Sequence, residues 1–360
     1  MKIGLIGLNQ TGKTTLFELL TNKTEGETSA SGKGLANTGL GVVPDSRVDF
    51  LSKMYNPKKT TYAKIEFTDV AGFAVSDNQK SGAAKFLNDV RPCDAIVHVI
   101  RGFESSSIFH DLETIDPPRD LELVESEMLL ADMELIDKRI ERIKAGKKIT
   151  KEHEQEMEFL DRCFNWLEEG GTIREMERTE DEDLAIRGYS FLTDKPRLAV
   201  INMDENQWEN KSWAKREALT EACRKLNIPL IELCALMELE ISRLPDEDKA
   251  IFMEDLGIME SGVEVLARQV YEHLGLISFF TVGADEVKAW TIEKGTIAKK
   301  AAGKIHTDFE RGFIRAEVTK YNDLFEQKSM ANVKEKGLFR LEGKEYVVVD
   351  GDVINFRFNV

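Results

Sequence analysis

The stretch that most constrains this chain is Gly7-Leu8-Asn9-Gln10-Thr11-Gly12-Lys13-Thr14, which has the pattern G-x-x-x-x-G-K-T. The apolar segment Lys2–Ile6 precedes it, and leucines and a phenylalanine follow at helical spacing. A strand, a glycine loop and a helix in this order indicate a phosphate-binding loop rather than a chance match in a turn. We predict that nucleotide phosphates contact Asn9, Gln10, Thr11, Gly12, Lys13, Thr14 and Thr15, with Mg²⁺ on the Thr14 hydroxyl.

A second candidate is Thr68-Asp69-Val70-Ala71-Gly72, which follows a predicted strand with alternating apolar residues, Ala63–Phe67. An aspartate at a strand end can hold Mg²⁺, and the N–H of a following glycine can bind a terminal phosphate. The pattern D-x-x-G alone also occurs in ordinary turns. Its position beyond the phosphate loop and just past a strand favours Asp69 as a metal ligand and Gly72 as a phosphate contact.

The residue after Gly72 is Phe73, where small GTPases commonly have a glutamine that orients the attacking water. Phenylalanine cannot hydrogen-bond to water, so either hydrolysis is weak or another residue supplies the polar group. His110 follows the predicted buried strand Asp94–Ile100 and is our candidate catalytic residue together with Lys13. The alternative is that His110 is an ordinary solvated loop histidine.

The ends of two later predicted strands, Arg197–Ile201 and Ile228–Leu233, provide the candidate base site. Guanine-binding domains have N-K-x-D after the first of these strands, whereas this chain has Asn202-Met203-Asp204-Glu205. Adenine presents a lone pair where guanine presents a ring N–H, so a displaced carboxylate suits adenine better. We predict that Asn202, Met203, Glu205, Cys234 and Ala235 contact the base, with Met203 covering the ring, and that ATP is preferred over GTP.

Apolar residues between Leu121 and Arg187 follow a period of about 3.5 residues in two runs, which predicts a coiled-coil-like pair of antiparallel helices. The turn between the runs is basic, with Lys144, Lys147, Lys148 and Lys151. Two interpretations stay open for this turn, a solvated tip and a contact with a nucleic-acid phosphate backbone. Before this region, the segment Thr21–Gly41 is rich in Gly, Ser, Thr and Asn and is predicted to be a mobile loop at the position of a first switch.

The last 85 residues differ in composition, with 14 Lys and Arg against 13 Asp and Glu, whereas the whole chain has a net charge of −16. Their short strands, interrupted by two helical pieces, predict a small α+β module. The strands are expected at Ile277–Val282, Trp290–Ile292, Ile314–Val318, Tyr346–Val349 and Val353–Phe358, and the helices at Thr307–Arg311 and Ser329–Lys336. The alternation of strands and helices before residue 276 predicts a doubly wound, mostly parallel α/β sheet.

Composition excludes several classes of protein. The acidic balance argues against indiscriminate nucleic-acid binding, so we expect no DNA partner. No run of about 18 apolar residues occurs, which predicts no membrane span. The four scattered cysteines argue for buried thiols rather than disulfides or zinc, and the start of the chain lacks a signal segment. We therefore expect a cytoplasmic protein.

With these residues assembled, the chain closely resembles the Obg-like ATPase family, also called YchF. The resemblance is most specific in Trp290–Thr296, in Ala301–Ile314 and in the final Asp350-Gly351-Asp352-Val353. It implies a P-loop domain at 1–120 and 190–275, a helical hairpin inserted at 121–189 and a β-grasp TGS domain at 276–360. It also implies ATP and Mg²⁺ as ligands, a hydrophobic residue at Phe73, a catalytic histidine in the loop of His110, and the ribosome as partner.

The chain departs from the family in two places. The family's phosphate loop usually has Pro-Asn-Val where this chain has Asn9-Gln10-Thr11. The segment Thr21–Gly41 does not match the family's first switch, so Thr38 is the nearest candidate for the second Mg²⁺-linked threonine.

We therefore predict a monomeric, Mg²⁺-dependent ATPase that acts as a ribosome-associated switch, with slow or partner-stimulated turnover. One alternative is a GTPase of the Obg-related class. Another is a nucleotide-dependent module that binds ribosomes or RNA with negligible hydrolysis. An RNA-binding protein with a vestigial phosphate loop is disfavoured because Gly12, Lys13, Thr14 and Asp69 are all present.

Overall fold

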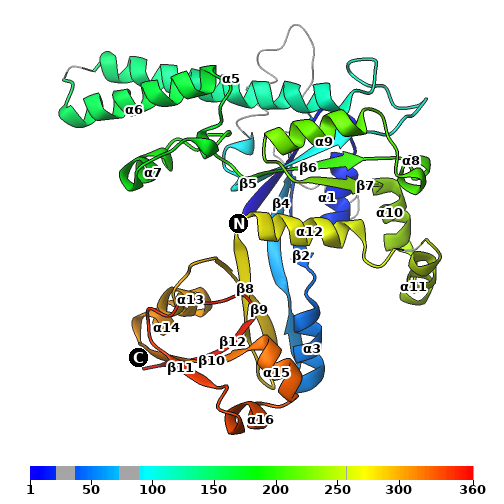
Figure 1. Cartoon of the computed structure of the whole chain (residues 1–360), viewed down its shortest axis with the longest axis vertical. Helices are drawn as coiled ribbons and strands as arrows, with labels where there is room; N and C mark the ends of the chain where they lie inside the picture. The colour runs from blue at the N-terminus through cyan, green and yellow to red at the C-terminus, as the bar shows by residue number, and fades with distance from the viewer. Residues whose placement is uncertain (22–36, 73–88, 147, 257, 360) are drawn as a thin grey trace. The chain divides into compact units, whose positions relative to one another are not determined.

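The computed structural model describes residues 1–360 except 22–36, 73–88, 147, 257 and 360 (Figure 1). It divides into two compact units. The first comprises Met1–Gly39 and Glu66–Val263, and the second comprises Leu40–Ile65 and Glu264–Val360. In the described parts of the chain, no helix is both long and apolar enough to cross a membrane. All four cysteines are free and buried, as predicted.

The first unit is built on a six-stranded sheet with the order β2-β4-β1-β5-β6-β7. The strands are β1 (Lys2–Ile6), β2 (Asn37–Val43), β4 (Ala63–Asp69), β5 (Ala95–Arg101), β6 (Arg197–Asn202) and β7 (Leu230–Leu233). Strand β1 pairs in parallel with β4 and β5, and β5, β6 and β7 continue the parallel ladder. The predicted, mostly parallel α/β sheet is therefore confirmed. Because the strands are parallel, the segments after β1, β4, β5, β6 and β7 all leave the same edge of the sheet.

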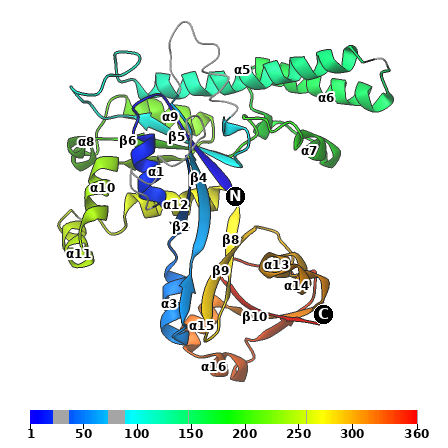
Figure 2. The same cartoon turned by 180° about the vertical axis from the view of Figure 1, so that it is seen from behind.

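Helices connect the strands of this sheet, and the α5–α6 hairpin extends away from it (Figures 1 and 2). They are α1 (Lys13–Thr21), α5 (Pro117–Lys144), α6 (Lys151–Glu168), α7 (Glu180–Ile186), α8 (Glu205–Asn210), α9 (Arg216–Lys225), α10 (Ala235–Arg243), α11 (Asp246–Asp255) and α12 (Gly262–His273), with a 3₁₀ turn at Ile173–Glu175. Helix α12 continues into the second unit.

The predicted helical hairpin is formed by α5 and α6. Asp116 caps α5 ahead of Pro117, and Thr150 caps α6 with a capping box. Apolar side chains from both helices share one buried cluster, which includes Ile136, Ile140, Phe159, Leu160 and Cys163. The hairpin is therefore held by packing along a common apolar seam.

The second unit has its own six-stranded sheet, with the order β11-β10-β12-β8-β9-β3. Its elements are α3 (Ser46–Tyr55), β3 (Lys59–Thr61), β8 (Leu276–Thr281), β9 (Glu286–Glu293), α13 (Ala298–Ile305), α14 (Thr307–Arg311), β10 (Phe313–Lys320), α15 (Tyr321–Gln327), α16 (Met330–Glu335), β11 (Arg340–Glu342) and β12 (Asp352–Phe358). Its core gathers apolar residues of the sheet and three alanines of α13. The mixed α+β character predicted for the C-terminal residues is confirmed.

Three expectations about local structure differ from what is observed. Tyr346–Val349 is not a strand, since only Val347 forms an isolated bridge, with Ile297. The Asp352 side chain accepts hydrogen bonds from Tyr346 Oη and Val349 N and so holds this segment as a turn. Asn37–Gly41, expected to be loop, belongs to strand β2. Residues 40–65, expected in the nucleotide domain, join the second unit, where β3 pairs with β9.

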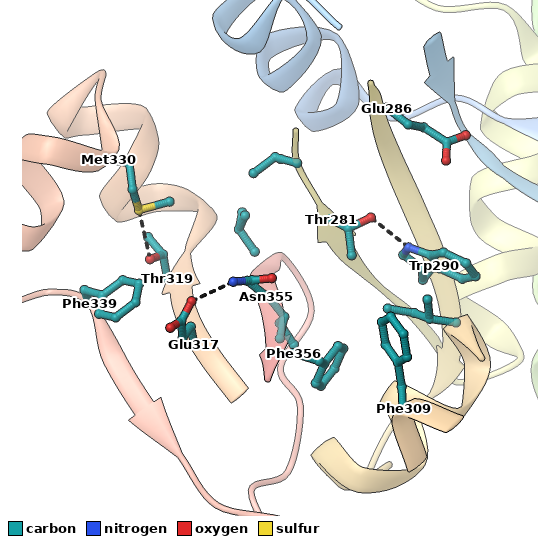
Figure 3. A pocket seen from close by; sticks show the side chains of 14 residues that line it. Thr281, Glu286, Trp290, Phe309, Glu317, Thr319, Met330, Phe339, Asn355 and Phe356 are labelled. Atoms are coloured by element: carbon teal, nitrogen blue, oxygen red, sulfur yellow. Dashed lines mark hydrogen bonds between the residues drawn. The ribbon is translucent and has the colours of Figure 1, made fainter. Parts of the chain in front are cut away.

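The second unit contains a cavity of about 340 Å³ (Figure 3). It is lined mainly by residues of β8, β9, β10 and β12. Several of its polar lining groups are hydrogen-bonded, since Trp290 donates to Thr281 and Asn355 donates to Glu317 (Figure 3), while Glu286 accepts from Thr61. Among the described residues that line the cavity, no buried side-chain nitrogen or oxygen lacks a hydrogen-bond partner, which would mark a ligand site.

Candidate functional site

The phosphate loop, Gly7–Thr14, has a backbone that requires glycine at two positions. Gly7 and Gly12 have φ values of +145° and +93°. A Cβ on Gly7 would lie 2.2 Å from the carbonyl oxygen of Val99, and one on Gly12 would lie 2.3 Å from the Asn202 side-chain nitrogen. Both glycines are therefore needed for the close approach of neighbouring strand ends as well as for the turn itself.

Lys13 is folded back into this loop. Its Nζ donates to the carbonyl oxygen of Leu8 at 2.6 Å, and the residue is only 6% exposed. Burial lowers the pKa of Lys13 to about 8, against the opposing pull of the Asp69 and Asp111 carboxylates. The lysine is thus held at the loop that would receive the phosphates.

Thr14 and Asp69, two of the predicted metal ligands, lie side by side. Thr14 Oγ1 donates to Asp69 Oδ2 at 2.9 Å. Burial raises the pKa of Asp69, while the Thr14 hydrogen bond and the Lys13 charge lower it. A hydroxyl beside a carboxylate fits Mg²⁺, which takes few protein ligands and fills its shell with phosphate oxygens and water. Among the residues described, no three His, Cys, Asp or Glu side chains gather as a metal-binding group.

Thr38, the third predicted metal ligand, is exposed in the edge strand β2, which lies next to β4 in the sheet. Its role as a ligand stays a prediction. Gly72 lies against the phosphate loop, because a Cβ there would be 2.2 Å from Asn9 Oδ1. Phe73 lies outside the described residues.

His110 is not a solvated loop residue. Its side chain is 4% exposed, and its Nε2 lies 2.9 Å from Asp120 Oδ2. Its Nδ1 accepts the backbone N–H of Leu112 at 3.1 Å, so Nε2 carries the proton and donates to Asp120. Both ring nitrogens are therefore engaged, and His110 must leave Asp120 before it can orient a water molecule.

At the base corner (Asn202–Glu205 with Cys234–Leu236), Asn202 acts as a brace. Its Nδ2 donates to the Thr11 carbonyl oxygen at 3.0 Å, and its Oδ1 accepts the Ala235 N–H at 3.0 Å. The residue is 6% exposed. Asn202 therefore joins the phosphate loop to the base corner. Each end of the amide keeps one further hydrogen-bonding position, and a contact of Asn202 with the base stays a prediction.

The Met203 side chain differs from its predicted role. It is 3% exposed and packs with Ile201, Trp213 and other core residues. Its side chain therefore stabilises the core and is not placed to cover a base. The exposed apolar residue at this corner is instead Leu236, which is 59% exposed in the first turn of α10.

The remaining predicted residues of the base corner come together. Glu205 opens α8 and is exposed, whereas Cys234 and Ala235 at the start of α10 are buried. Burial raises the pKa of the Cys234 thiol, and the Glu205 and Asp204 carboxylates raise it further. These carboxylates therefore lie close to the start of α10, and α8 and α10 are neighbours in both views (Figures 1 and 2).

Sequence reasoning missed three residues. Asp111 accepts a hydrogen bond from Asn9 Nδ2 at 2.9 Å, and Asp120 holds His110. Leu236 is the exposed apolar residue of the base corner. An acid directly after a candidate catalytic histidine could have drawn attention to Asp111, but nothing in the sequence distinguishes Asp120 or Leu236 from ordinary helix residues.

The sheet, the glycine loop with its lysine, and the Thr14–Asp69 pair define a P-loop nucleotide-binding protein. Residues 2–132 match a family described as "50S ribosome-binding GTPase". Residues 276–359 match the C-terminal domain family of YchF GTPases, described as a protein of unknown function.

Full-length relatives identify the family. The chain is 43% identical over 363 residues to a Bacillus subtilis protein named "Ribosome-binding ATPase YchF", covering 99% of each chain. It is 38% identical over 364 residues to an Escherichia coli O157:H7 protein of the same name, covering 100% of this chain and 99% of that one. A solved structure of the Schizosaccharomyces pombe YchF GTPase superposes with a TM-score of 0.87 at 29% identity, covering 99% and 97% of the two chains. The chain belongs to the YchF family.

Proposed function

We propose that this protein is a Mg²⁺-dependent ATPase that works as a ribosome-associated switch. The observation that carries the proposal is the convergence of Lys13, the Thr14–Asp69 pair and the glutamate-bearing base corner at one edge of the sheet. The names of the full-length relatives, which are ribosome-binding ATPases, support the same activity here.

The phosphates would lie along the N–H groups of the phosphate loop and the N-terminus of α1. The Lys13 ammonium group would donate to phosphate oxygens in place of the Leu8 carbonyl oxygen, since it already lies within the loop. The Thr14 hydroxyl and the Asp69 carboxylate would hold Mg²⁺, which when bound would neutralise charge on the phosphates.

Adenine would lie at the base corner against the exposed Leu236 side chain, with Glu205 nearby. Asn202 would hold the two halves of the site at a fixed separation, because it bonds to Thr11 and to Ala235. The absence of an aspartate at the guanine-reading position supports ATP over GTP. The competing candidate is a GTPase, which the name of the fission yeast protein favours.

Hydrolysis would use His110 to orient water after the ring leaves Asp120. Because that step breaks two hydrogen bonds of a buried side chain, turnover by the protein alone should be slow. The same observation favours the second candidate function, a nucleotide-dependent ribosome-binding module that hardly hydrolyses. In that case His110 would be a structural residue of the loop.

Ribosome binding would use the basic tip of the hairpin. Lys144 ends α5 and Lys151 begins α6, and both are exposed, as is Lys148. Lys147 lies outside the described residues. A compact group of lysines suits contact with an RNA phosphate backbone, and reversing the charge of Lys148 and Lys151 should weaken co-sedimentation with ribosomes.

The proposal is tested by measuring ATP and GTP turnover with and without ribosomes, in wild type and in His110→Ala. We expect ATP turnover that ribosomes stimulate and that falls about a hundredfold or more in His110→Ala, the lower end of the range for a general acid–base group. Turnover unchanged in His110→Ala would remove the catalytic role of this residue. No turnover in either protein, with intact ribosome binding that depends on ATP, would establish the non-hydrolysing module.

A further inference from the structure

The first part of the loop between β5 and α5, Gly102–Asp111, follows β5 in Figure 1. A buried arginine holds this segment in place. Arg101, at the end of β5, is only 1% exposed. Its guanidinium donates to the carbonyl oxygens of Phe103, Ile108 and Phe109 at 3.1, 2.9 and 3.2 Å. All of these acceptors lie in the loop, so Arg101 fixes the loop up to the residue before His110.

At its far end the same loop is attached to two different partners. His110 turns toward the first turn of α5, where Asp120 accepts its Nε2–H and is itself held by the Arg119 guanidinium. The next residue, Asp111, turns toward the phosphate loop and accepts a hydrogen bond from Asn9 Nδ2 at 2.9 Å. The loop is thus tied at one side to the hairpin helix and at the other to the nucleotide site.

Asp111 also brings negative charge to the phosphate site. Its carboxylate raises the pKa of Lys13, as the Asp69 carboxylate does. Asp111 is therefore within electrostatic range of the ammonium group that would bind phosphate. A bound triphosphate would add several negative charges close to this carboxylate. The Asn9–Asp111 hydrogen bond is exposed to solvent, so water can replace either partner when the bond breaks.

We propose that Asp111 is a positioning residue that makes His110 respond to bound nucleotide. While the phosphate loop is empty, the Asn9–Asp111 hydrogen bond holds Asp111 at the phosphate loop and so keeps the neighbouring His110 ring on Asp120. When a triphosphate binds, repulsion between its phosphates and the Asp111 carboxylate breaks this bond and turns Asp111 away. Because His110 and Asp111 face opposite sides of the segment, the same rotation turns His110 toward the terminal phosphate. The inference rests on the proposed catalytic role of His110.

The experiment compares kcat and KM for ATP in wild type, Asp111→Asn and Asn9→Ala. Asp111→Asn removes the charge but keeps an oxygen that Asn9 can bond to, so nucleotide should bind more tightly while His110 stays on Asp120. We expect KM and kcat both to fall, each by roughly three- to tenfold, the range of one partly exposed charge. Asn9→Ala removes the bond and keeps the charge, so kcat should rise and KM should not fall.

Two controls distinguish the proposed role of Asp111 from a general loss of packing. Glu113→Gln neutralises a neighbouring exposed acid of the same segment and should change neither constant. In a His110→Ala background, Asp111→Asn should still tighten ATP binding but no longer change kcat. A general loss of packing would instead weaken binding and lower the urea midpoint, which we expect to be unchanged.

The inference is overturned if Asp111→Asn weakens ATP binding. It is also overturned if His110→Ala abolishes turnover but Asp111→Asn leaves kcat unchanged. If His110→Ala itself leaves turnover unchanged, the proposed catalytic role fails instead, and the measured tightening by Asp111→Asn still decides whether this carboxylate faces the phosphates.

Discussion

The phosphate loop and the base corner lie at the same edge of one sheet, yet they differ in what builds them. The phosphate loop depends on backbone geometry, with glycines at positive φ and N–H groups at a helix start. At the base corner, binding depends on side chains, and two of these, Asn202 and Met203, are used inside the protein. A motif that specifies backbone shape therefore predicts the geometry of a loop, whereas a motif of side chains leaves open which of them face the ligand.

The largest effect is expected at the phosphate end. Lys13→Ala removes the ammonium group stored on the Leu8 carbonyl, and should lower ATP turnover by about a hundredfold or more. ATP binding, measured by calorimetry, should weaken as well. Lys225→Ala, at a lysine whose side chain is 72% exposed in α9, is the matched control and should behave as wild type. Wild-type turnover in Lys13→Ala would mean that the phosphates bind elsewhere.

The next effect concerns the brace between the two regions. Asn202→Ala leaves the Thr11 carbonyl and the Ala235 N–H without their buried partner, which should cost roughly 1–3 kcal/mol in the free energy of unfolding. Nucleotide affinity should fall together with stability, since both halves of the site lose their fixed spacing. Urea unfolding and calorimetry measure the two quantities, with exposed Asn206→Ala as control. A stable variant with weakened ATP binding alone would show that Asn202 contacts the nucleotide after all.

A smaller effect is expected at the base itself. Glu205→Asp shortens the side chain toward the arrangement that reads guanine, so the ratio of ATP to GTP affinity should fall by roughly three- to tenfold. Glu209→Asp, an exposed glutamate later in α8, should leave the ratio unchanged. An unaltered ratio in Glu205→Asp would mean that the backbone or Leu236, not this carboxylate, selects the base.

The smallest effect is the pH dependence of ATP affinity. Burial lowers the pKa of Lys13 to about 8 in the protein without nucleotide, so the lysine is largely neutral above that pH. Phosphate binding requires the charged form, and ATP affinity should fall as the pH rises from 8 to 9, by at most about tenfold. Calorimetry in two buffers should detect proton uptake on binding at pH 9 and little at pH 7. The free energy of unfolding should change in the opposite direction. Above pH 8 the folded state binds fewer protons at Lys13 than the unfolded state does, so the contribution of Lys13 to the free energy of unfolding rises with pH.

Much of the fold could be predicted because it follows from local patterns. The segment Lys2–Ile6, the hairpin and the loop glycines carry their periodicity or conformational demand in a few neighbouring residues. The pairing of β3 with β9 could not be predicted, because Lys59 and Glu286 are far apart in sequence and β3 has three residues with no apolar pattern. The same limit applies at the site, where the Asn9–Asp111 and His110–Asp120 bonds depend on where a loop folds.

The central claim is that one edge of the sheet holds a triphosphate at Lys13 and distinguishes adenine from guanine at the base corner. Calorimetric titration of wild-type protein with ATP and with GTP, each in the presence of Mg²⁺, tests it most directly. We predict that ATP binds at least tenfold more tightly than GTP, a difference of about 1.4 kcal/mol. Equal affinities, or tighter binding of GTP, would contradict the account.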